Sequence, residues 1–176
     1  MAGNHRKVVA RYLDGKLVKG YTFDFGPSQP RFHVFAQPSA SGTSTQVLVR
    51  DLKALFFVRD LVGDPGRHDS QGLPPGDASA GRHVEIRFRD GEVMVGTVDS
   101  PTTDAPGFFL VPVDAESNNL RVYVVAAATR AVYPLPPVPA VARSTAGSPG
   151  VRGGRLPSET SARPLLPSRL LTWLTR

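Results

Sequence analysis

Apolar and polar residues alternate along two stretches of the chain that resemble each other. Residues 8–20 read VVARYLDGKLVKG, and residues 84–96, which begin 76 positions later, read VEIRFRDGEVMVG. Alternation with a period of two is typical of a half-buried strand, and Asp-Gly between two such runs is typical of a hairpin. Because the same pattern occurs twice, we interpret the chain as a tandem repeat.

Each repeat is expected to form five short strands. The expected strands of the first repeat are residues 7–13, 16–25, 31–36, 46–50 and 54–59. Those of the second repeat are residues 82–89, 92–98, 108–113, 121–125 and 130–133. Five short strands in about 50 residues fit a small barrel, so we predict an all-β fold of two tandem five-stranded barrels of the Sm or SH3 type. A single sandwich of ten strands is the alternative.

Glycines mark two special positions in each expected hairpin. Asp14-Gly15 and Asp90-Gly91 are expected at the centre of type I′ turns, which need a positive φ at both central positions. Gly20 and Gly96 fall in the middle of the second strand, where glycine is expected if the backbone bends sharply or another segment passes close.

We expect the two barrels to pack together, because so small a barrel buries too little of its surface to be stable alone. On the presumed outer face of the first strand, Val9 and Leu13 are apolar where the second repeat has charged residues. Phe56 and Phe57 are consecutive and point to opposite faces of their strand, so one of them is expected at the interface between the barrels.

The predicted organisation is a first barrel at residues 5–62, a flexible linker at 63–80, a second barrel at 81–134 and a tail at 135–176. The linker is rich in Gly and Pro. The tail is rich in Pro, Arg and Ser and is predicted to be disordered. A short terminal helix at 168–175 would carry a set of apolar side chains for docking: Leu170, Leu171, Trp173 and Leu174.

Charge is unevenly distributed along the chain. The net charge is +6, but residues 1–134 carry 15 Lys and Arg against 14 Asp and Glu. Residues 135–176 carry six Arg and one Glu. Any attraction to polyanions is therefore expected to come mainly from the tail and to weaken with salt.

Several classes of chemistry have no support in the sequence. There is no cysteine, and His5, His33, His68 and His83 lack the spacing of a metal site. No Gly-x-Ser-x-Gly motif and no glycine-rich loop before a helix is present. We therefore predict no catalytic residues, no metal and no cofactor. No apolar run is long enough to span a bilayer, so we expect no transmembrane segment and a cytoplasmic location.

Five residues form a candidate binding rim: Phe25, Arg31, Asn118, Asn119 and Arg121. The amides of Asn118 and Asn119 beside the guanidinium of Arg121 would suit a peptide backbone or a base edge. The simpler interpretation of the two Asn residues is a hairpin loop in which they bond to their own backbone, and this interpretation is favoured.

Four phrases resemble an uncharacterised bacterial domain family of unknown function over about residues 6–134. They are LKALFFVRD (52–60), PGFFLVPVD (106–114), SNN (117–119) and RVYV (121–124). This resemblance implies no activity. The glycine spacing is also similar to that of Sm-like barrels, which bind RNA through a loop with Asp, an aromatic and Asn, and through an Arg-Gly pair. Asp24-Phe25 matches the first two, whereas the Asn and the Arg-Gly pair are missing.

These observations favour a non-enzymatic binding or adaptor module whose partner is another protein. The tail would dock on that partner or touch a membrane surface peripherally. Binding of single-stranded nucleic acid, RNA in particular, is the alternative, with tail arginines on phosphates and rim aromatics on bases. An enzyme is the third and least supported hypothesis.

Overall fold

The computed structural model describes residues 5–64, 66–67, 69–70, 72–73, 82–99 and 105–136. This part of the chain is all-β, as predicted, with two 3₁₀ turns, η1 (Val49–Asp51) and η2 (Ala126–Ala128). The strands of the first half are β1 (Arg6–Tyr12), β2 (Leu17–Thr22), β3 (Arg31–Phe35), β4 (Ser44–Leu48) and β5 (Leu52–Val58). Those of the second half are β6 (Arg82–Phe88), β7 (Val93–Val98), β8 (Gly107–Pro112), β9 (Asn119–Val125) and β10 (Thr129–Pro134).

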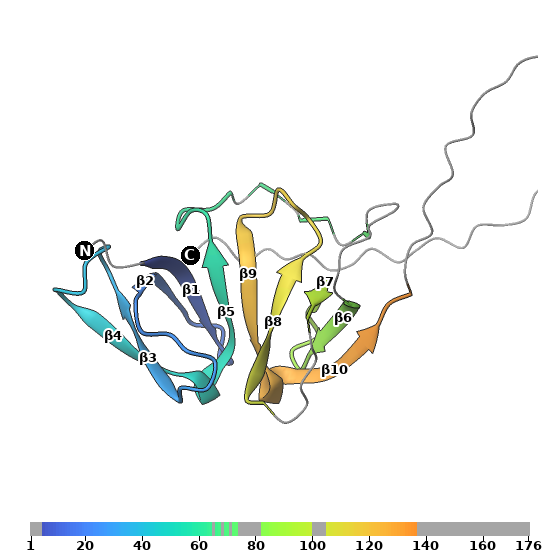
Figure 1. The fold of residues 1–176 in the computed structure, drawn as a ribbon, viewed down its shortest axis with the longest axis horizontal. Helices are drawn as coiled ribbons and strands as arrows, with labels where there is room; N and C mark the ends of the chain where they lie inside the picture. Colours follow the sequence, from blue (N-terminus) through green and yellow to red (C-terminus); the bar gives the residue numbers. More distant parts are fainter. Residues whose placement is uncertain are drawn as a thin grey trace, which may run out of the picture.

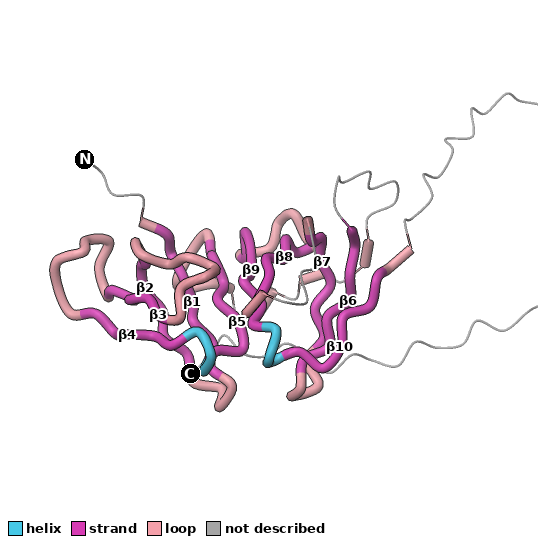
Figure 2. The backbone as a smooth tube through the Cα atoms, turned by 60° about the horizontal axis from the view of Figure 1, so that its bottom comes forward, coloured by secondary structure: helices cyan, strands magenta, loops and turns pink. Residues whose placement is uncertain are grey.

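All of these strands belong to one antiparallel sheet in the order β10-β6-β7-β8-β9-β5-β1-β2-β3-β4. The second half repeats the strand order of the first, and each half has its 3₁₀ turn before its last strand. Figures 1 and 2 show the two halves side by side, with β4 at one end of the molecule and β10 at the other.

The prediction of two separate barrels is not confirmed, because the sheet is not closed in either half. A five-stranded barrel closes when its last strand pairs with its fourth. Here β5 pairs with β1 along one edge and with β9 of the other half along its second edge. The strand that would close the first half is therefore used to join the halves.

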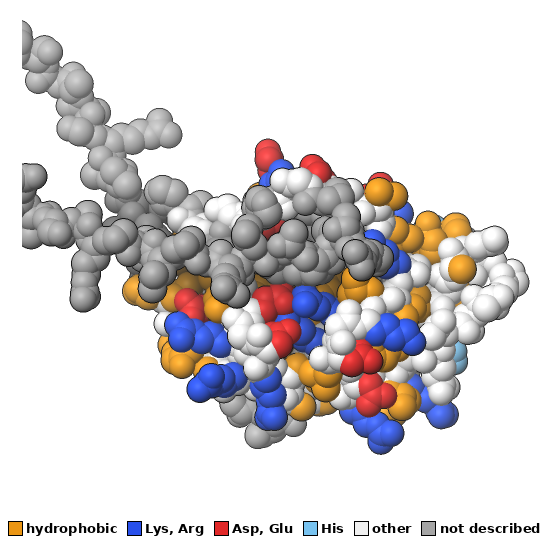
Figure 3. Space-filling view, turned by 180° about the vertical axis from the view of Figure 1, so that it is seen from behind, with side chains coloured by type: hydrophobic (Ala, Val, Ile, Leu, Met, Phe, Trp, Pro, Cys, Tyr) orange, Lys and Arg blue, Asp and Glu red, His pale blue; other side chains and the backbone are white. Residues whose placement is uncertain are grey.

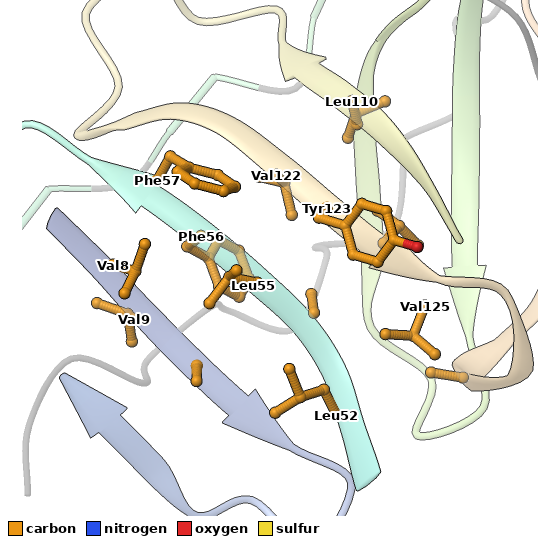
Figure 4. Packing of buried hydrophobic residues seen from close by; sticks show 14 of the residues in the cluster. Val8, Val9, Leu52, Leu55, Phe56, Phe57, Leu110, Val122, Tyr123 and Val125 are labelled. Carbon is orange, nitrogen blue, oxygen red and sulfur yellow. The ribbon is translucent and has the colours of Figure 1, made fainter. Parts of the chain in front are cut away.

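The two halves bury opposite faces of the shared strands. Residues directly opposite each other on neighbouring antiparallel strands point to the same face. Leu55 pairs with Ala10 and with Tyr123, so Tyr123 of the second half points to the side of the first half's core. Phe56 pairs with Val122 on the opposite face, which is the core side of the second half. Figure 4 shows both sets of side chains along β1, β5 and β9.

The apolar residues expected at the interface have different outcomes. Val9 is 4% exposed, and together with Phe56 and with Met94 of the second half it lines a small pocket. Both Phe56 and Phe57 are buried, one on each face of β5. The expectation is wrong for Leu13, which is 55% exposed because it lies in the hairpin turn rather than on the strand.

An ion cluster links the two halves next to the second hairpin turn. Lys53 is almost fully buried, and its ammonium donates hydrogen bonds to Asp90 and to Glu92. Glu92 also pairs with Arg11 at 2.9 Å, and the Lys53 ammonium lies 4.4 Å from the ring centroid of Phe88. Two cations of the first half are thus neutralised by two carboxylates of the second.

On the rear face of the molecule, acidic and basic side chains lie next to one another (Figure 3).

Two glycines in the second strands are required by a close approach of the third strands. A Cβ at Gly20 would lie 2.2 Å from the carbonyl oxygen of Phe35, and one at Gly96 would lie 2.5 Å from that of Val111. Distances this short are not compatible with any side chain, so glycine is the residue that lets these strands meet. Of the two reasons expected for a glycine in the middle of a strand, a sharp bend or the close approach of another segment, the structure shows the close approach.

The hairpin turns differ from the predicted type I′ geometry. The amide of Gly15 donates to the carbonyl of Tyr12, so Leu13 and Asp14 occupy the central positions of the turn. Gly15 follows them with a φ of +89°. This arrangement is a type I turn followed by a glycine bulge, in which glycine supplies the one left-handed position.

Some of the predicted segments lie outside the described residues. The tail from residue 137 onward does, including the terminal helix at 168–175 and its Leu170, Leu171, Trp173 and Leu174. Described parts of the predicted linker contact the loop between β8 and β9: Asp114 accepts hydrogen bonds from the Ser70 amide and the Arg67 guanidinium.

Candidate functional site

An aromatic cluster lies where the two halves join. Phe25, in the loop after β2, is surrounded by four rings in edge-to-face contact. The centroid distances are 5.1 Å to Phe32, 5.6 Å to Phe57, 6.4 Å to Phe109 and 5.1 Å to Tyr123. Two of these rings come from each half, so Phe25 of the first half packs against a surface that both halves build.

Tyr123 also fixes the loop that carries Phe25. Its side chain is fully buried, and its hydroxyl donates a hydrogen bond of 2.9 Å to the carbonyl of Pro27. Burial raises the pKa of Tyr123 above its usual value, so the hydroxyl keeps its proton and acts as the donor.

A groove of about 450 Å³ lies beside this cluster, where β1, β5 and β9 meet. Four of the side chains that line it are cationic and two are phenylalanines, and none is a carboxylate. They are Arg6, Lys7, Arg59, Arg121, Phe57 and Phe109. A concave surface with several cations and aromatic rings can bind an anionic group through charge and a planar group through stacking.

Two of the three arginines of the groove lie over its phenylalanines. The guanidinium carbon of Arg121 is 3.4 Å from the ring centroid of Phe109, and that of Arg6 is 5.8 Å from that of Phe57. Burial is the main cause that lowers the pKa of Arg121, and the positive charge of Arg6 adds to it, against the opposing effect of Asp99. An anion in the groove would relieve the repulsion between the two guanidinium groups.

The other two cations of the groove hold its wall in place. The Arg59 guanidinium donates to the carbonyls of Ser117 and Ala115, in the loop before β9. The ammonium of Lys7 donates to the carbonyl of Arg59 at 2.9 Å. Arg6 and Arg121 are therefore the cations best placed to contact a ligand, whereas Arg59 mainly orders the loop.

Two of the five predicted rim residues come together at this groove. Arg121 lines it, and Phe25 packs against both of its phenylalanines. Arg31 lies at the exposed start of β3 and does not line the groove. Asn118 and Asn119 line a different pocket, together with Val9 and Phe56 of the opposite sheet face.

The polar atoms of the two Asn residues are used in structural hydrogen bonds. The Asn118 side chain accepts from the amide of Asp60 and donates to its carbonyl, both at 2.9 Å. The side-chain amide of Asn119 donates to Asp69 at 3.5 Å, and Ser117 donates to the same carboxylate oxygen at 2.6 Å. Both side chains therefore bond to residues of the segment after β5 rather than to their own backbone, and they hold this segment against the loop before β9.

Sequence reasoning missed Arg6, Lys7, Phe57 and Phe109 as parts of one surface. They lie on three strands that are far apart in sequence, and the pairing of β5 with β9 brings them together. The only sequence pattern that pointed to this surface was RVYV (121–124), because its alternation places Arg121 and Tyr123 on one face of the strand.

Two further features are absent from the described part of the chain. It holds no group of three or more His, Asp or Glu side chains arranged to bind a metal ion. It also contains no helix long and apolar enough to cross a membrane.

Comparison with known proteins supports one of the two resemblances. The chain has no match among curated proteins or solved structures. A family of unknown function, DUF6982, matches residues 4–135, which include every strand of the sheet. This match confirms the resemblance to an uncharacterised domain family, and it covers most of the chain. The protein therefore belongs to this family of unknown function, DUF6982.

Proposed function

We propose that the protein is a non-enzymatic binding module and that its groove binds single-stranded nucleic acid. The observation that carries this proposal is the meeting of four cationic side chains and two phenylalanine rings in one groove that no carboxylate lines. Cations bind the phosphates of a single strand, and aromatic rings or arginine planes stack on its bases.

The guanidinium–ring pairs favour a nucleic acid over an acidic peptide. The guanidinium of Arg121 lies 3.4 Å over the ring centroid of Phe109, and a base could stack on the plane of this guanidinium. An acidic peptide would pair with the cations of the groove but would have no base to stack on its planar side chains. The site recognised would be a backbone with unpaired bases rather than a defined sequence.

The experiment is fluorescence anisotropy with labelled single-stranded RNA and DNA and the full chain. We expect Arg121→Ala and Arg6→Ala each to weaken binding, and to reduce the slope of log affinity against log salt by about 0.7 per lost phosphate contact. Arg50→Ala is the matched control, because Arg50 is an exposed arginine on η1 outside the groove. Since the basic tail is present in every variant, its contribution cancels. Equal affinities for wild type and Arg121→Ala would refute the groove as the binding site.

A protein partner is the second candidate, in keeping with the adaptor role that the sequence favours. The observation behind it is that the sheet ends in strands whose outer edges have no neighbour among the described residues. Unpaired edges recruit extended segments of other chains through backbone hydrogen bonds.

A further inference from the structure

The junction between the halves is a contact between two unlike strands. β5, the last strand of the first half, pairs with β9, the fourth strand of the second half. All seven residues of β5 are buried as a result. The strands left at the ends of the sheet are β4, the fourth strand of the first half, and β10, the last strand of the second half. Among the described residues, one copy of the chain thus carries one strand of each kind with an unpaired outer edge.

The two free edges match the two sides of the internal junction residue by residue. Aligning η1 with η2 matches Val47 of β4 with Val124 of β9, and Ala54 of β5 with Ala131 of β10. Because Ala54 pairs with Val124, the same junction between two molecules would pair Ala131 of one with Val47 of the other. In this register Tyr133 stands opposite Thr45.

The composition of the edges also fits a contact of this kind. Ser44–Leu48 contains neither a charged residue nor a proline, which are the residues that usually protect an edge strand. Arg130 occupies the place of Lys53 and Asp14 that of Asp90, so one cation–carboxylate pair of the internal ion cluster is retained, whereas Lys16 occupies the place of Glu92 and the second carboxylate is lost. Pro134 removes one backbone donor from β10, so this contact would be weaker than the internal one.

We propose that the protein associates with itself head to tail, the β10 edge of one molecule adding to the β4 edge of the next. This rests on the second candidate function above and is independent of the groove. The two edges lie at opposite ends of the molecule (Figures 1 and 2), so they do not meet within one chain. A contact between unlike surfaces leaves one free edge at each end of a dimer and continues into a ring or an open chain.

The test uses two variants of the full chain that each block one edge. Thr45→Lys places a charge on β4, and Tyr133→Lys places one on β10; both positions are exposed, so the substitutions leave the core intact. Molar mass is measured by light scattering after size exclusion over a range of concentrations. We expect oligomers for wild type, monomers for either variant alone, and dimers that do not grow when the two variants are mixed.

The mixture distinguishes this proposal from its alternatives. Dimers form in the mixture because one variant retains an intact β10 and the other an intact β4. Val62→Lys, at a 76% exposed position away from both edges, is the control and should oligomerise like wild type. Monomeric wild type at every concentration, or oligomers that persist in Thr45→Lys, would overturn the proposal. Neither result bears on nucleic-acid binding, which is measured separately at the groove.

Discussion

The hydroxyl of Tyr123 donates a 2.9 Å hydrogen bond to the carbonyl of Pro27, across 96 residues of sequence and from one half of the sheet to the other. The same ring packs 5.1 Å from Phe25. Tyr123 belongs to the second half in sequence but packs into the core of the first half. Its substitution is expected to report on the junction between the halves.

Tyr123→Phe should lower the free energy of unfolding by about 1–2 kcal/mol, because it leaves the carbonyl of Pro27 without its donor. Denaturant unfolding of the full chain measures this change. Tyr133→Phe is the control, since Tyr133 is 47% exposed and should lose almost nothing. Equal stabilities for wild type and Tyr123→Phe would mean that the hydrogen bond contributes nothing to the junction.

Gly96→Ala should destabilise the protein by roughly 1–3 kcal/mol, as expected when an extra methyl group is forced into a packed site. Its Cβ would lie 2.5 Å from the carbonyl oxygen of Val111. At Gly26 the nearest atoms to an added Cβ are 3.4 Å away, on the flexible side chain of Gln29, so Gly26→Ala should be tolerated. Thermal unfolding of the two variants makes the comparison, and a Gly96→Ala melting curve identical to that of wild type would contradict it.

Lys53→Met should lower the free energy of unfolding at neutral pH by about 3 kcal/mol, the lower end of the range for breaking a buried ion pair. The substitution keeps the volume of the side chain but leaves Asp90 and Glu92 without their shared ammonium. Arg50→Met is the control, because Arg50 is a largely exposed cation. Denaturant titrations of both variants would test this, and equal losses in the two would argue against the ion cluster.

The same variant should show a distinct pH dependence. Burial alone would raise the pKa of Asp90, but the hydrogen bonds from Lys53 and from the Glu92 amide, together with the charges of Lys53 and Arg11, outweigh it, and the pKa is lowered. Such a carboxyl gives stability that is present above its unfolded pKa of about 4 and is lost as the pH falls through the folded pKa. The difference in stability between wild type and Lys53→Met should therefore shrink as the pH is lowered from about 5 to about 3. A difference that stays constant over this range would show that Lys53 acts by packing alone.

Asp114→Asn should loosen the attachment of Arg67 and Ser70 to the loop between β8 and β9. Hydrogen bonds, first of all from the Ser70 amide, lower the pKa of Asp114, so it is a carboxylate that accepts through both oxygens. An Asn side chain has one acceptor oxygen and cannot replace both. Hydrogen exchange at Ser70 should accelerate in the variant while exchange in β1 stays unchanged. Acceleration in both places would indicate general destabilisation instead.

The strands were predictable from the sequence because their signal is local. The expected strand at residues 82–89 and β6 (Arg82–Phe88) differ by one residue, and the other strands agree to within a few. Alternation with a period of two reports which residues share a face, and it needs no knowledge of the partner strand. The consecutive pair Phe56–Phe57 even indicated that β5 is buried on both sides.

The order of the strands could not be predicted in the same way. Whether β5 pairs with β4 or with β9 depends on which edges meet in space, and both choices satisfy the same alternation. The groove depends on this choice, because Arg6 and Arg121 belong to different halves. Asn118 and Asn119 were predicted in a binding rim because side-chain amides can bind ligands. In the structure their hydrogen-bond partners are Asp60 and Asp69, which lie about 50 or more positions earlier in the sequence.

The exchange of core residues between the halves has a consequence for synthesis of the chain. The first half leaves the ribosome with β5 exposed along one edge and with Phe25 lacking the ring that covers it, because both are completed by β9. Its aromatic core therefore stays unfinished until Tyr123 has been translated. Domains generally fold as units during synthesis, and here the unit is the pair of halves. The N-terminal half therefore completes its fold only after β9 has been synthesised. A chain that ends before β9 would expose the apolar edge of β5.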